Sequence, residues 1–85
     1  GIEQTVTVNG ISAFPNPTSD RLTVSSGYNS MQSITVMDLS GKIIDDYKEV
    51  NASQFELSTT AYNSGIYLVK VVSADGVSTL KFSKL

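Results

Sequence analysis

Short stretches in which apolar and polar residues alternate recur along the chain. Between Arg21 and Ser25, Leu22 and Val24 alternate with polar neighbours, and this two-residue period is typical of a strand with one buried face. Turn residues separate such stretches, and no long 3.6-residue period of an amphipathic helix is present. The pattern therefore predicts strands and turns rather than helices.

The alternating stretches predict six or seven short strands. They are residues 11–14, 21–25, 31–39, 42–50, 54–58, 66–72 and 77–84. The stretch 66–72 is apolar on both faces apart from Lys70, as expected for a central strand. The stretch 42–50 is rich in charge, which indicates an edge strand. Residues 58–65 form a longer loop with room for one helical turn.

Many short strands at regular spacing favour an all-β, antiparallel β-sandwich. In such a fold two sheets pack about 10 Å apart and each buries one face. The inward-facing apolar positions define the predicted core, which is Leu22, Val24, Ile34, Val36, Ile44, Phe55, Leu57, Tyr67, Val69, Val71, Leu80 and Phe82.

The run Phe14-Pro15-Asn16-Pro17-Thr18 interrupts this pattern just before the strand at 21–25. Each proline fixes its own φ, lacks an N–H and biases the preceding residue towards an extended conformation. We expect a rigid, non-helical corner that aims the following strand. Such a corner serves geometry or recognition and supplies no catalytic group.

The chain divides into a polar linker and one domain. Residues 1–10 are polar, with a weak extended stretch at Thr5 to Val8 and a turn signal at Asn9-Gly10. Residues 11–85 are enough for one small core. Because the chain begins with Gly1 and shows no signal peptide, we interpret it as a fragment or mature piece of a longer protein.

Composition and charge exclude several classes of function. The formal net charge is −2, which argues against nucleic-acid binding by clustered lysine and arginine. No apolar run approaches the roughly 20 residues of a membrane-spanning helix. The chain has no cysteine, so it offers neither disulfides nor thiolate metal sites.

We expect no catalytic residues, no cofactor and no metal site. Without histidine or cysteine, a Ser–His or Cys–His nucleophile cannot form within the chain. Asp45 and Asp46 are adjacent in a strand and point to opposite faces. Asp20, Asp38 and Asp75 stand beside turns, where solvated acids are common, and no Asp-rich calcium loop is present.

Four separated motifs carry a specific resemblance. They are Phe14-Pro15-Asn16-Pro17-Thr18-Ser19-Asp20 with Leu22-Thr23-Val24, Ile34-Thr35-Val36-Met37-Asp38-Leu39-Ser40-Gly41-Lys42, Leu57-Ser58 with Ser64-Gly65-Ile66-Tyr67-Leu68-Val69-Lys70-Val71, and Gly76 leading to Lys81-Phe82-Ser83-Lys84. In this order and spacing, residues 11–85 resemble the C-terminal sorting domain (type A) of cargo proteins of the bacterial type IX (Por) secretion system.

The resemblance implies both a fold and a function. It implies an immunoglobulin-like β-sandwich of about seven strands at the end of a larger secreted protein of Bacteroidetes. Such domains direct their cargo from the periplasm through the outer-membrane translocon to the cell surface or the medium. The implied partners are the type IX translocon and attachment-complex proteins, including a sortase-like peptidase. In many relatives this peptidase removes the domain, here within residues 1–10, and joins the cargo to an anionic lipopolysaccharide.

The motifs also define candidate recognition residues. These are Pro15, Asn16, Pro17, Gly41, Lys42, Gly65, Tyr67, Lys70, Lys81, Lys84 and Leu85. Each has a structural alternative: the prolines can shape a strand exit, Gly41 can supply a positive φ for a hairpin, and Tyr67 can be a core residue with a tethered hydroxyl. If the last strand lies at a sheet edge, its free backbone could pair with a partner strand.

Two other functions stay open from the residues alone. An adhesion or carbohydrate-binding module would need aromatic residues on one exposed face, and Tyr28, Tyr47 and Tyr62 are spread through the chain. A weak homodimer could form through the strand face that carries Ile66, Leu68 and Val72.

Overall fold

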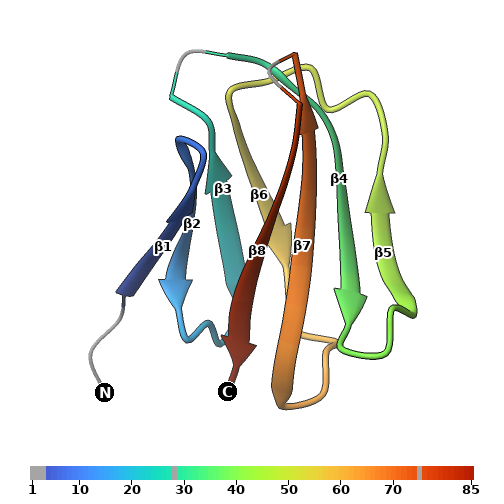
Figure 1. Cartoon of the computed structure of the whole chain (residues 1–85). Coiled ribbons are helices and arrows are strands. Elements are labelled where there is room, and N and C mark those ends of the chain that lie inside the picture. Colours follow the sequence, from blue (N-terminus) through green and yellow to red (C-terminus); the bar gives the residue numbers. More distant parts are fainter. Residues whose placement is uncertain (1–3, 28, 75) are drawn as a thin grey trace.

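Two antiparallel four-stranded sheets pack face to face in this protein (Figure 1). A computed structural model describes residues 4–27, 29–74 and 76–85. The strands are β1 (Gln4–Val8), β2 (Ile11–Asn16), β3 (Arg21–Ser25), β4 (Met31–Asp38), β5 (Ile43–Tyr47), β6 (Gln54–Ser58), β7 (Gly65–Ser73) and β8 (Gly76–Lys84). Within these described residues there is no helix, and the predicted all-β sandwich is confirmed.

The strand order within each sheet identifies the edges. Sheet A has the order β1-β2-β3-β6, and sheet B has the order β5-β4-β7-β8. All neighbouring strands are antiparallel. β7 lies between β4 and β8, as its apolar sequence predicted, and β5 is an edge strand, as its charges predicted.

The sequence predicted six or seven strands, and β1 is an additional one. Val6, Thr7 and Val8 pair with β2 across the turn at Asn9 and Gly10. Gly1–Glu3 lie outside the described residues, so the role of residues 1–10 as a linker stays a prediction. The structure shows in addition that Gln4–Val8 form β1, the edge strand of sheet A.

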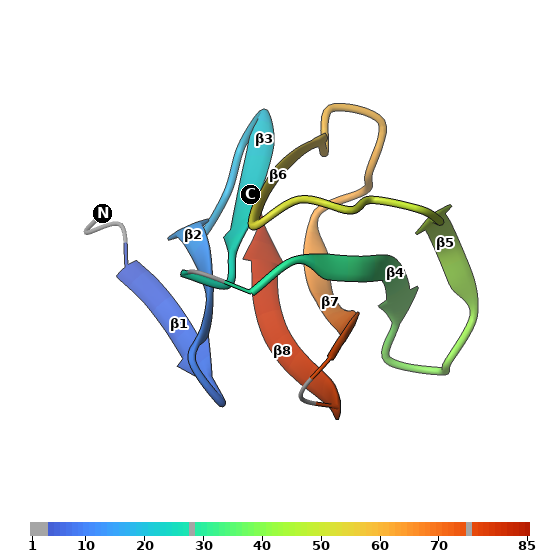
Figure 2. The same cartoon turned by 90° about the horizontal axis from the view of Figure 1, so that it is seen from above.

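The core lies between the two sheets (Figure 2). Its buried apolar side chains are Ile11, Ala13, Leu22, Val24, Met31, Ile34, Val36, Leu57, Tyr62, Tyr67, Val69, Val71, Leu80 and Phe82. The predicted core is buried except at two positions. Phe55 is partly buried against this cluster, and Ile44 is 36% exposed, so its assignment to the core was wrong.

A β-bulge explains the exposure of Ile44. Val36 pairs with Asp45, but the next residue, Met37, pairs with Ile43. Ile44 is therefore an extra residue without a partner in the register, and the bulge reverses the inward–outward alternation of β5. As a result Asp45, rather than Ile44, shares the inward side of the sheet with Val36.

Candidate recognition surface

Parts of all four sequence motifs meet at one end of the sandwich. The proline corner at the end of β2, the β4–β5 turn, the start of β7 and the end of β8 lie at the lower end in Figure 1. The pairing confirms this arrangement, since Lys84 lies opposite Gly65 and also forms a parallel bridge with Thr18. Residues far apart in sequence are thus gathered into one region.

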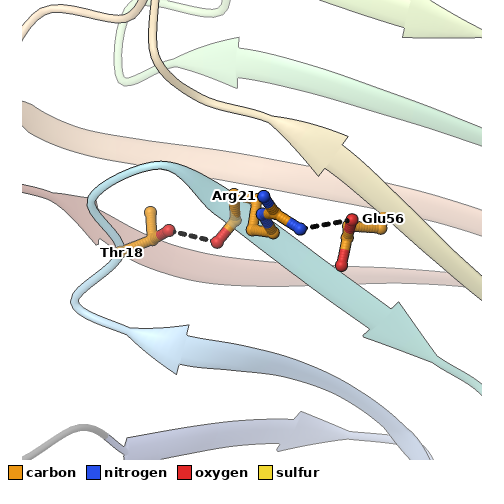
Figure 3. Close-up of polar contacts among 3 residues, drawn as sticks. All are labelled: Thr18, Arg21 and Glu56. Atoms are coloured by element: carbon orange, nitrogen blue, oxygen red, sulfur yellow. Dashed lines mark hydrogen bonds and ion pairs between the residues drawn. The ribbon is translucent and has the colours of Figure 1, made fainter.

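The proline corner turns the chain from β2 into β3. The peptide bonds Phe14–Pro15 and Asn16–Pro17 are both cis. Thr18 is fully buried, and its Oγ1 donates a 2.5 Å hydrogen bond to the carbonyl of Arg21 (Figure 3). This bond closes the corner onto the first residue of β3.

The corner also holds the end of β8. The Ser83 N–H donates to Asn16 Oδ1 at 2.9 Å, the Thr18 N–H donates to the Ser83 carbonyl at 2.8 Å, and the Leu85 N–H donates to the Thr18 carbonyl at 2.9 Å. We call these three hydrogen bonds the C-terminal clasp. The edge of β8 at Ser83 and Leu85 is therefore already paired and is not free for a partner strand.

The second motif builds the β4–β5 turn. Asp38 Oδ1 accepts hydrogen bonds from Ser40 N at 2.9 Å, Ser40 Oγ at 2.6 Å and Lys42 N at 3.0 Å. The Ser40 hydroxyl and the Lys42 N–H hold the pKa of Asp38 below its ordinary value of 3.8. Gly41 has a φ of +91°, which favours glycine. Gly41 therefore has a structural role here, and the exposed Lys42 follows it.

The third motif fixes the connection into β7. Gly65 begins β7 with a φ of +151°. Tyr67 is buried, and its hydroxyl donates a 2.7 Å hydrogen bond to the carbonyl of Asn63. The centroid of its ring lies 5.6 Å from the centroid of the Phe82 ring. A strand tyrosine whose hydroxyl bonds a backbone carbonyl a few residues upstream resembles the tyrosine corner of immunoglobulin-like folds.

A part-buried hydrogen bond between a tyrosine and an aspartate has no counterpart among the sequence predictions. Tyr62, in the β6–β7 loop, donates a 2.6 Å hydrogen bond to Asp45 Oδ2. Burial and this carboxylate raise the pKa of Tyr62 far above its ordinary value, and burial with the charge of Asp45 also raises that of Tyr47. In the sequence, Tyr62 stands out as an aromatic residue in an otherwise polar loop. The bulge that turns Asp45 inward has no sequence signature.

The candidate lysines do not form one cluster. Lys70 and Lys81 are exposed on the outer side of sheet B, where Lys70 pairs with Thr79 and Lys81 pairs with Leu68. Lys84 is half-buried at the end of β8 and its Nζ donates to the Leu85 carbonyl. The structure thus places Lys84 with the clasp and the other two lysines along the sheet.

An open groove of about 310 Å³ lies over β3 and β6. Its charged lining residues include Arg21 and Glu56, whose side chains form a 3.2 Å ion pair (Figure 3). Both side chains are more than half exposed, and such surface pairs contribute about 0–1 kcal/mol. The pair links neighbouring strands, and Asp20 adds a further acidic residue to the lining of the groove.

The described part of the chain offers no group of three acidic, histidine or cysteine residues placed to hold a metal ion. In the same residues no helix is long and apolar enough to cross a membrane.

The architecture is an immunoglobulin-like β-sandwich. A DUF3244 family protein from Bacteroides vulgatus with this fold superposes with a TM-score of 0.67 at 18% identity, over 89% of this chain and 85% of that chain. Residues 12–84 match the family model described as the secretion system C-terminal sorting domain. The chain therefore belongs to this family of sorting domains. A comparison with curated proteins gave no match.

Proposed function

We propose that this domain is a folded address that directs a larger cargo protein through the outer membrane by the type IX secretion system. Membership of the sorting-domain family carries the proposal. The gathering of the motifs at one end of the sandwich supports it, because a receptor could contact them together (Figure 1). The proposed partners are the translocon and the attachment complex with its sortase-like peptidase.

The proposed route runs through the periplasm to the cell surface or the medium. Removal of the domain would require cleavage before β2, in residues 1–10. Because Val6 to Val8 are paired with β2, cleavage ahead of β1 would leave sheet A whole. We therefore propose that any cleavage in residues 1–10 falls ahead of Gln4, where β1 begins.

The alternative of a carbohydrate-binding module has little support from the described aromatic residues. Tyr47 packs against Phe55 with ring centroids 4.9 Å apart, and Tyr62 and Tyr67 are buried. Tyr28 lies outside the described residues. These side chains serve the core rather than an exposed stacking platform.

The proposal is tested by fusing residues 1–85 to a periplasmic reporter in a bacterium that has the type IX pathway. We expect the reporter at the cell surface in the wild-type strain and in the periplasm of a translocon mutant. An unrelated immunoglobulin-like domain in the same fusion is the control and should stay in the periplasm. Periplasmic retention of the intact fusion in the wild-type strain would reject the sorting function.

A further inference from the structure

The two outer faces of the sandwich differ in chemistry. On sheet A the outward residues are polar apart from the half-buried Phe14: Thr7, Ser12, Arg21, Thr23, Ser25, Gln54, Glu56 and Ser58. On sheet B the outward residues include a set of apolar side chains, which we call the apolar face: Met37, Ile43, Ile66, Leu68, Val72 and Val77. Solvent-facing positions of a sandwich are normally polar, so sheet B departs from the expected pattern.

Most of the apolar face forms one row across the sheet, and a polar row of Thr35, Lys70 and Thr79 separates that row from Val72 and Val77. Ile43 pairs with Met37, and Met37 pairs with Leu68, so three strands contribute to one row. Ile43 is 58% exposed, Val77 is 55% exposed and Ile66 is 42% exposed. Sheet A covers only the opposite side of β4 and β7 (Figure 2).

Two lysines give this face a positive charge. Lys81 continues the row of Leu68 onto β8, and Lys70 lies between Leu68 and Val72 on β7. Within the described residues the one ion pair joins Arg21 and Glu56, so both ammonium groups lack a carboxylate partner. Asp46 lies at the far end of the Lys70 row, where Thr35 separates it from Lys70 and donates a hydrogen bond to it. With two lysines and one aspartate, this side of the sheet keeps a net positive charge.

The size and charge of this face indicate its occupant. With the polar row included, it measures about 14 Å across four strands and about 20 Å along β7, or roughly 300 Å². A stable dimer needs about 800 Å² from each partner. A second copy would also bring two more unpaired lysines into the contact, whereas an acidic partner would compensate them.

We infer that the apolar face binds a protein of the export machinery through a surface that combines apolar and acidic side chains. This inference rests on the proposed function and adds the face by which the domain is held. Contacts of this size are typical of weak, transient complexes.

The reporter fusion tests the inference with matched variants. We expect Ile66→Ser and Lys70→Glu each to lower surface reporter at least tenfold. Lys48→Glu, which makes the same charge change outside the apolar face, should export like the intact fusion. Circular dichroism and thermal denaturation establish whether each variant is folded. If Ile66→Ser does not fold, the export of Lys70→Glu alone tests the inference.

Each remaining outcome counts against the inference. Export of folded Ile66→Ser and Lys70→Glu at the intact level would overturn it while leaving the sorting function in place. Retention of the intact fusion would overturn both. Concentration-dependent dimers of residues 1–85 that Ile66→Ser abolishes, seen by light scattering, would identify a second copy as the occupant instead.

Discussion

Tyr67 combines a buried ring with one tethered polar atom. Its hydroxyl donates a 2.7 Å hydrogen bond to the Asn63 carbonyl, and its ring contacts the rings of Tyr62 and Phe82. Tyr67→Phe keeps the ring but leaves that carbonyl without its donor. We expect the free energy of unfolding to fall by about 1–2 kcal/mol, measured by urea denaturation with an unchanged m-value. An unchanged midpoint would mean that the tether does not stabilise the β6–β7 connection.

Asn16 is the residue whose side chain completes the C-terminal clasp. Its Oδ1 accepts from Ser83 N in a segment where Pro15 and Pro17 supply no N–H. In Asn16→Ala the Ser83 amide loses its acceptor, so we expect a loss of about 1–2 kcal/mol and faster hydrogen exchange at that amide.

Asn16→Asp is the matched control, because a carboxylate oxygen can accept the same bond. Its Ser83 amide should stay protected from exchange. Equal exchange rates for Ser83 in the wild type and in Asn16→Ala would contradict the role of this side chain. Amide exchange followed by NMR gives both results in one measurement.

At the scale of one element, the β4–β5 turn depends on a charged carboxylate. The pKa of Asp38 is lowered in the folded state, chiefly by the Ser40 hydroxyl and the Lys42 N–H. A lowered folded-state pKa stabilises the fold above the unfolded value, and this contribution is lost as pH falls through the folded value. We therefore expect stability to decline on acidification below about pH 4.

Asp38→Asn removes this titration while keeping an oxygen that can accept the turn hydrogen bonds. The variant should show a smaller fall in its urea midpoint between pH 5 and pH 2 than the wild type. Asp20→Asn, at an aspartate outside this turn, is the control for the loss of one negative charge. Identical pH profiles for Asp38→Asn and the wild type would show that the turn gains nothing from the charge.

The strands themselves were largely predictable, because their two-residue period is a local property of the sequence. The bulge in β5 was not, since one extra residue exposes Ile44 and turns Asp45 inward without any local signal. The clasp was also out of reach, because Asn16 and Ser83 meet only through the tertiary fold. Long-range contacts of this kind decide which motif residues are structural.

The candidate recognition residues also divide into those that local structure explains and those that only the tertiary fold brings together. Gly41 and Tyr67 drew attention as motif residues, and their turn and tether account for them locally. Lys70 and Lys81 share an outer face that only the register of β7 and β8 defines. Sequence alternation had placed Lys70 beside Ile66, Leu68 and Val72, but the extension onto β5 required the pairing of Met37 with Ile43.

At the scale of the whole molecule, the C-terminal segment contributes both buried core side chains and exposed side chains. Phe82 is 1% exposed, whereas Leu85 is 66% exposed. Replacing a buried phenylalanine by alanine costs about 3–5 kcal/mol. A domain of 85 residues has a total stability of about 4–13 kcal/mol, so loss of this one ring removes a large share of it.

We therefore expect Phe82→Ala to lower the thermal midpoint by at least about 12 °C, while Leu85→Ala should change it by no more than about 4 °C. A chain that lacks residues 81–85 loses Phe82 and two residues of the clasp together, and should show no cooperative transition by circular dichroism. An export defect of that truncated chain would then report unfolding rather than a lost contact. A truncated chain that melted at the midpoint of the intact domain would refute this coupling, and its export could be interpreted directly as recognition.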